Sequence, residues 1–179
     1  KAGTSWLHHW LSQHPEIFMP EKKELHYWDA YRNKQSIDWY LNHFTSSDRV
    51  QGEITPAYAI LPLPVIEEIW RHFPQLKIIY ILRNPIERAW SSALMALRRA
   101  ELEYHEASEQ WFIDHFNSNG SSSRGNYLAC LKNWYSVFPK EQLLICRYEE
   151  IIIDPEAILN RCLKFLGIAV STFYQKHHQ

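Results

Sequence analysis

The apolar run LKIIYIL at residues 76–82 constrains the fold most, because the beginning of a helix follows it directly. A short run of this kind is typical of a strand buried on both faces of a parallel sheet. Asn84 then supplies an N-cap, Pro85 suits the first helical position, and Glu87 stands three residues after the cap. We therefore expect a strand that leads into a helix over residues 85–100.

The rest of the chain repeats this alternation of short strands and amphipathic helices. Apolar periodicity predicts further helices at residues 4–13, 36–45, 64–73, 106–116, 125–138 and 155–166. We also expect strands at residues 50–55 and 143–148, an extended segment at 16–28 and a serine-rich loop at 117–123. This order implies an α/β fold in three layers, with a central parallel sheet flanked by helices. Ligands of such folds bind beyond the carboxyl ends of the strands.

Length and composition fit one domain over residues 1–179. Hydrophobic residues make up 46% of the chain and the formal net charge is −1, which argues against a general nucleic-acid binder. The three cysteines lack CxxC spacing, so we expect buried free thiols at Cys130, Cys146 and Cys162. No apolar run approaches the ~18 residues of a membrane span. Because the chain starts inside a motif, we expect a domain trimmed at both ends.

The first residues of the chain are typical of an anion-binding loop that runs into a helix. Gly3 lets the backbone bend, Thr4 and Ser5 add hydroxyl donors, and Lys1 adds a positive charge. The helix start adds N–H groups and the positive end of its dipole. Lys1 precedes the glycine, so this is not the Walker loop of ATPases. A surface turn is the alternative interpretation.

A second anion site is expected where the strand at residues 76–82 ends. Arg83 ends the strand, and Ser91 lies on the following helix. Arg88 shares a helical face with Ser91 and would add a second guanidinium group. The alternative is a surface helix in which Arg88 pairs with a nearby glutamate. Two anion sites together fit a ligand that is phosphorylated at two separate positions.

Glu24 and His26 are candidates for general base catalysis. In an extended segment Glu24, His26 and Trp28 point the same way, and Asp29 could orient His26 if the chain turns there. A solvated edge strand is the alternative interpretation. Tyr127 stands at a helix start from which it could reach a nucleotide. The adjacent histidines of the chain lack metal-ligand spacing, so we assign no metal.

Taken together, these motifs resemble those of sulfotransferases that use 3′-phosphoadenosine 5′-phosphosulfate (PAPS). KAGTSWL resembles the family's 5′-phosphosulfate loop, and IYILRNPIERAWSS resembles its 3′-phosphate motif. KELHYWD and GEITPAY resemble segments of the heparan sulfate and related glycosaminoglycan sulfotransferases. The segment that begins RGNYLACLKNWY resembles their later helix–strand–helix run. The motifs occur in the family's order along nearly the whole chain.

The resemblance implies a P-loop-like sulfotransferase fold, PAPS as donor, a hydroxyl acceptor that is preferably a saccharide, and no metal. The 5′ end of the donor would be held by Lys1, Ala2, Gly3, Thr4, Ser5 and Trp6, and the 3′-phosphate by Arg83 and Ser91, with Tyr127 also contacting the donor. Glu24 matches the catalytic base, with His26 and Asp29 in its supporting network, and Lys1 would stabilise the leaving oxygen. His26 stays open as the alternative base.

Some positions depart from the glycosaminoglycan enzymes. Ile54 stands where these enzymes often have a lysine, and Ser5 replaces a basic residue found in some of them. The chain ends at residue 179, before the family's usual Lys-rich donor loop. These departures weaken the case for heparan sulfate as acceptor more than the case for sulfuryl transfer.

Two competing functions and two compartments stay open. A non-catalytic nucleotide or saccharide binder is one alternative, and a nucleotide-dependent kinase is another, although a kinase would need a complete Walker loop. Three scattered cysteines slightly favour a reducing compartment and hence the cytoplasm. Enzymes of the glycosaminoglycan type imply the Golgi lumen instead.

Overall fold

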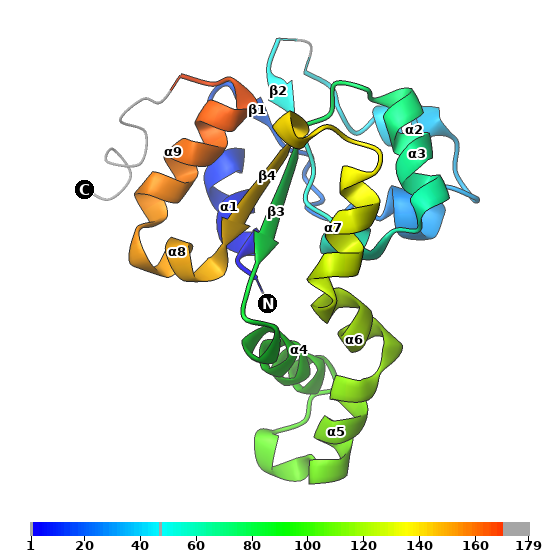
Figure 1. Ribbon diagram of the computed structural model, residues 1–179, viewed down its shortest axis with the longest axis vertical. Helices are drawn as coiled ribbons and strands as arrows, with labels where there is room; N and C mark the ends of the chain where they lie inside the picture. Colours follow the sequence, from blue (N-terminus) through cyan, green and yellow to red (C-terminus); the bar gives the residue numbers. More distant parts are fainter. Residues whose placement is uncertain (1, 47, 170–179) are drawn as a thin grey trace.

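Two pairs of parallel strands organise the computed structural model, which describes residues 2–46 and 48–169 (Figure 1). In the first pair, β1 (Ile17–Phe18) lies beside β2 (Val50–Gln51). In the second, β3 (Ile78–Leu82) lies beside β4 (Leu143–Arg147), with Tyr80 opposite Ile145. Both strands of the second pair are among those expected from the sequence.

Helices cover the β3–β4 pair on both sides (Figure 1). On one side lie α1 (Thr4–Ser12), α8 (Tyr148–Ile153) and α9 (Pro155–Leu166); on the other lie α2 (Ile37–Leu41), α3 (Leu63–His72) and α7 (Tyr127–Tyr135). Beyond the carboxyl ends of β3 and β4 lie α4 (Pro85–Arg99), α5 (Glu109–Asn117) and α6 (Asn119–Gly125). Short helical turns occupy Tyr27–Tyr31, Pro56–Ile60, Tyr104–Glu106 and Lys140–Gln142. This arrangement agrees with the predicted three-layer α/β fold.

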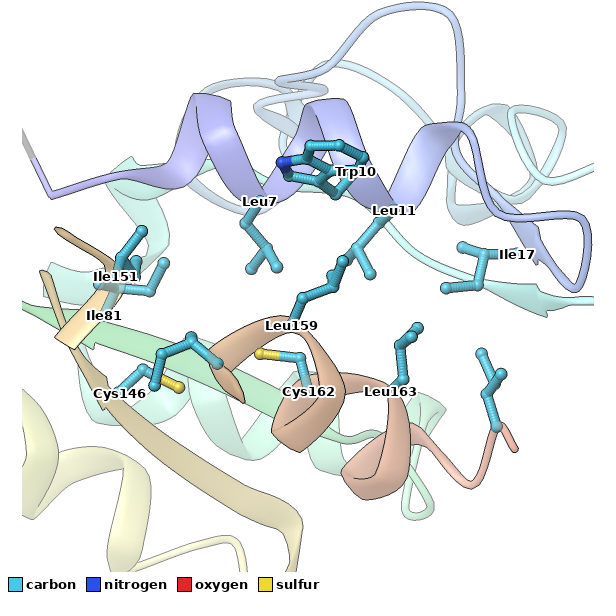
Figure 2. Packing of buried hydrophobic residues seen from close by; sticks show 12 residues of the cluster. Leu7, Trp10, Leu11, Ile17, Ile81, Cys146, Ile151, Leu159, Cys162 and Leu163 are labelled. Carbon is cyan, nitrogen blue, oxygen red and sulfur yellow. The ribbon is translucent and has the colours of Figure 1, made fainter. Parts of the chain in front are cut away.

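An apolar cluster packs between the strands and the helices α1 and α9 (Figure 2). Leu7 and Leu11 of α1 point toward Leu159 and Leu163 of α9, so the N-terminal helix is fixed against the C-terminal one. Cys146 and Cys162 belong to the same cluster, and all three cysteines are buried free thiols, as predicted.

The opposite face carries an aromatic cluster that fixes the segment around residue 26. Leu25, Tyr27 and Trp28 are buried in it together with Tyr40 and Ile66. The rings of Tyr27 and Tyr40 stack with centroids 4.8 Å apart. Burial of large aromatic side chains contributes strongly to stability, so the residues between them are held in a defined conformation.

Some local predictions from the sequence are wrong or incomplete. The serine-rich segment expected as a loop forms α6, because the side chain of Ser118 accepts a hydrogen bond from Ser121 N and caps this helix. The extended segment 16–28 keeps a strand only at Ile17–Phe18 and turns at His26. Residues 148–153 form α8, which the sequence analysis did not predict.

Candidate functional site

The N-terminal loop has the backbone that an anion site needs. Gly3 adopts φ 82°, a left-handed conformation that favours glycine, and α1 begins at the next residue. Gly3 has no side chain with which to cap this helix, so the first N–H groups of α1 lie open to an acceptor outside the helix. Ala2 and Trp6 pack against the apolar cluster and thereby anchor the loop to the core. Lys1, expected to bind and stabilise the donor, lies outside the described residues.

One aromatic ring touches both predicted anion sites. Tyr148, the first residue of α8, packs so closely on Gly3 that a methyl group at position 3 would lie 3.1 Å from its Cδ2. The guanidinium carbon of Arg83 lies 4.5 Å from the centroid of the same ring, a cation–π contact. The loop at residue 3 and the end of β3 therefore both lie against a single side chain.

The backbone around Arg83 is held by two long-range hydrogen bonds. The N–H of Arg83 donates to the hydroxyl of Tyr127 at 3.3 Å, and the N–H of Asn84 donates to Oε1 of Glu149 at 2.9 Å. Burial raises the pKa of Tyr127, and the hydrogen bond from Asn84 holds the pKa of Glu149 below its usual range. Tyr127 thus lies beside Arg83, the residue predicted to bind the 3′-phosphate. Ser91 is partly buried on α4.

Arg88, expected either to add a second guanidinium group to the anion site or to pair with a glutamate on a surface helix, is buried instead. Arg88 is only 8% exposed, and its Nη2 donates to the backbone oxygen of Ser121 at 2.7 Å. It joins α4 to α6 instead of pairing with a surface glutamate. The guanidinium group that pairs with Glu87 is that of Arg83, at 3.4 Å.

The candidate base Glu24 contacts His26, which in turn contacts Asp29, and the three form a cluster. Nε2 of His26 lies 3.3 Å from Oε2 of Glu24, and Nδ1 of His26 lies 3.0 Å from Oδ2 of Asp29. The expected turn that lets Asp29 orient His26 is therefore present. Trp28, which was expected on the same face, is buried in the aromatic cluster because the chain turns at His26, whose φ is 56°.

The segment GEITPAY at residues 52–58, which resembles a turn of the family, supports this cluster. Oε2 of Glu53 accepts hydrogen bonds from Leu25 N at 3.1 Å and from the hydroxyl of Thr55 at 2.5 Å. The hydroxyl of Tyr58 donates to Oε1 of Glu53 at 2.9 Å and accepts from Trp28 N at 3.4 Å. Burial and then the Glu53 carboxylate raise the pKa of Tyr58, so its hydroxyl stays protonated. Our sequence analysis gave these residues no positioning role, although their polar side chains beside Pro56 were a usable signal.

Lys23 links the base to the N-terminal loop, and the sequence analysis missed it. Its Nζ lies 3.2 Å from the hydroxyl oxygen of Ser5, 3.4 Å from that of Thr4, and 3.4 Å from Oε1 of Glu24. A continuous series of contacts therefore leads from Arg83 through Tyr148, the N-terminal loop and Lys23 to Glu24.

A cavity of about 280 Å³ opens beside the cluster. Asp29 lines it together with two arginines, Arg32 and Arg124, and with apolar residues from the turn at Pro56–Ile60 and from α3. Arg32 also pairs with Glu68 of α3. This cavity gives a second molecule a place next to the histidine–aspartate pair.

Known proteins share this sequence pattern and this fold. Residues 1–178 match the family described as "Sulfotransferase domain". The chain belongs to the sulfotransferase domain family. A solved sulfotransferase from Alicyclobacillus acidocaldarius is 30% identical, with a TM-score of 0.75 over 93% of this chain and 77% of that one. Mouse sulfotransferase SULT7A1, solved in complex with PAP, is 25% identical with a TM-score of 0.62, over 98% of this chain and 58% of its own. The predicted family and fold class are thus confirmed.

Curated relatives of this sulfotransferase domain are longer proteins. Membrane-associated sulfotransferase kil1 of Dictyostelium discoideum is 24% identical over 94% of this chain and 54% of its own length. Mouse heparan sulfate glucosamine 3-O-sulfotransferase 5 is 28% identical over 94% of this chain and 51% of its own length. The chain spans about half the length of these two relatives. Within residues 2–46 and 48–169, none of the helices combines the length and apolarity of a membrane span.

Proposed function

We propose that this domain transfers a sulfuryl group from PAPS to an acceptor hydroxyl. The observation that carries the proposal is that the ring of Tyr148 lies close to both Gly3 and Arg83. Two anion sites that share one ring are close enough for a single nucleotide with a 5′- and a 3′-phosphate. Membership of the sulfotransferase domain family and a related structure that contains PAP support the same donor.

The residues of the site divide the work between binding and proton transfer. Gly3, Thr4 and Ser5 would bind the 5′ end of PAPS through N–H and hydroxyl groups, and Lys1 would stabilise the leaving phosphate oxygen. Arg83 and Ser91 would bind the 3′-phosphate, with the hydroxyl of Tyr127 beside them. Glu24 would take the proton of the acceptor hydroxyl while Asp29 and His26 hold it in place.

A saccharide is the acceptor that we favour. Several curated relatives are named as heparan sulfate sulfotransferases, and the cavity beside Asp29 would take a sugar ring against its apolar wall. The compartment in which the domain works depends on its acceptor. One curated relative is named membrane-associated and others are named as heparan sulfate sulfotransferases, so we favour the Golgi lumen over the cytoplasm.

Calorimetric titration and a transfer assay test the proposal together. We expect the protein to bind adenosine 3′,5′-bisphosphate (PAP) and to prefer it over AMP and ATP. With sulfur-labelled PAPS, it should transfer label to at least one member of a panel of saccharide, lipid and small-molecule hydroxyls. Arg83→Met should lose PAP affinity, whereas Arg98→Met, on the exposed end of α4, should not.

Other results would favour the competing functions. Tight binding of PAP without transfer to any acceptor would identify a binding module. A preference for ATP over PAP would point to a kinase.

A further inference from the structure

The side chain of Lys23 lies between the parts of the site that handle donor and acceptor. Its Nζ contacts the hydroxyls of Thr4 and Ser5 on one side and the carboxylate of Glu24 on the other, all within 3.4 Å. The side chain is only 23% exposed. A group that moves from a donor bound at the loop to a hydroxyl held by Glu24 must therefore pass this ammonium group.

We propose that Lys23 is a catalytic residue that binds the oxygens of the sulfuryl group during its transfer. This inference rests on the proposed function. An ammonium group carries three donors that can rotate, so Lys23 can move its hydrogen bonds from Thr4 and Ser5 to sulfuryl oxygens with little displacement. Its charge acts more strongly in this partly water-excluded position than it would in bulk water.

The step balances without any further reactant. The acceptor oxygen forms a bond to sulfur while the bond from sulfur to the bridging phosphate oxygen breaks. Glu24 takes the proton of the acceptor hydroxyl, and the bond electrons leave with the phosphate oxygen of PAP. The ammonium group of Lys23 neutralises negative charge on the sulfuryl oxygens as the two bonds exchange.

The backbone explains why Lys23, and not Lys22, faces the site. The N–H of Ile54 donates to the backbone oxygen of Lys23 at 3.2 Å and fixes its direction. The side chain of Ile54 itself packs against the apolar cluster and contributes no charge. Lys22 lies with its Nζ 5.7 Å from the ring centroid of Tyr31, so it serves as a matched control of equal charge.

The test compares Lys23→Met, Lys23→Arg and Lys22→Met in the full chain. PAP lacks the sulfuryl group, so its binding reports on the phosphate sites without the proposed contact. We expect Lys23→Met to lower kcat by about 10²–10³-fold, the usual cost of removing a donor at developing charge. Its affinity for PAP should stay within about 3-fold of the unsubstituted chain. Lys23→Arg should keep more activity than Lys23→Met, and Lys22→Met should keep nearly all.

Each contrary result has a distinct meaning. If Lys23→Met turns over as fast as Lys22→Met, Lys23 does not act on the sulfuryl group. If PAP affinity falls in parallel with kcat, Lys23 only stabilises the conformation of the loop at Thr4 and Ser5. Both results overturn the inference and leave the proposed function intact. Failure of the unsubstituted chain to transfer label to any acceptor overturns the proposed function, and this role with it.

Discussion

Nε2 of His26 lies 3.3 Å from Oε2 of Glu24, while the other ring nitrogen of His26 faces Asp29. The imidazole thus stands between two carboxylates and has both nitrogens engaged. The carboxylate of Glu24 can still accept a hydrogen bond from an acceptor hydroxyl, because a carboxylate can accept several hydrogen bonds. This geometry favours Glu24 as the base and gives His26 a positioning role.

Substitution of Glu24 should separate binding from chemistry. We expect Glu24→Gln to lower kcat by about 10²–10⁴-fold, the usual contribution of a general base, and to leave PAP affinity nearly unchanged. His26→Ala should cost less, because Glu24 remains in place. Steady-state kinetics with labelled PAPS and titration with PAP measure both quantities. A fully active Glu24→Gln beside an inactive His26→Ala would show that the base is His26.

A methyl group at position 3 should damage the donor loop. Gly3→Ala must keep a φ of 82° and would place Cβ 3.1 Å from Tyr148 Cδ2 and from Ile151 Cδ1. The left-handed conformation alone costs about 1–2 kcal/mol for a residue with a side chain. We expect a lower melting temperature and weaker binding of PAP, because the loop must shift away from Tyr148.

Gly52→Ala is the matched control for this change. A Cβ there would meet only Met19 Sδ, at 4.0 Å. Thermal unfolding with and without PAP compares the two variants. Equal behaviour of both would mean that the contact between Gly3 and Tyr148 does not shape the loop.

Local signals in the sequence account for much of the fold. Asn84 accepts hydrogen bonds from Ile86 N and Glu87 N, so the predicted cap is present. The last helix has the same kind of local signals, because Asp154 accepts a hydrogen bond from Ala157 N and Gly167 ends the helix with a φ of 86°. Such signals lie within a few residues of the structure that they specify.

The parts that were missed depend on contacts between distant residues. The turn at His26 follows from burial of Tyr27 and Trp28 in a cluster with Tyr40 and Ile66, which alternation along a strand cannot reveal. Lys23 meets Ser5 across 18 positions of sequence, and no spacing pattern marks that contact. Local features such as these caps were therefore predictable, whereas contacts between distant residues were not.

Arg88 should matter for stability. Its guanidinium group donates to the backbone oxygen and the hydroxyl of Ser121 in a buried position. Arg88→Met would leave that backbone oxygen without this donor, and an unsatisfied buried group costs about 1–3 kcal/mol. We expect the free energy of unfolding in urea to fall by this amount. Arg98→Met changes an exposed arginine on the same helix and should have little effect; equal losses would contradict the structural role of Arg88.

Glu149 makes the stability of the backbone after Arg83 depend on acid pH. The N–H of Asn84 donates to its carboxylate, and this bond is the main reason that its pKa is lowered, with the charges of Arg83 and Arg147 adding to it. Folding therefore favours the ionised form. This contribution to stability is complete above the unfolded pKa, about 4.3 for a glutamate, and is lost as the pH falls through the folded value.

Replacement of this carboxylate should remove that dependence. Glu149→Gln keeps an oxygen acceptor for Asn84 but loses the charge, so we expect it to be less stable than the unsubstituted protein at neutral pH. The difference should shrink as the pH falls below about 4.3, because protonation then removes the same charge from the unsubstituted protein. Urea unfolding at a series of pH values measures this, with Glu67→Gln on the exposed face of α3 as control. A difference that stays constant across the series would show that Glu149 does not stabilise the backbone after Arg83 through its charge.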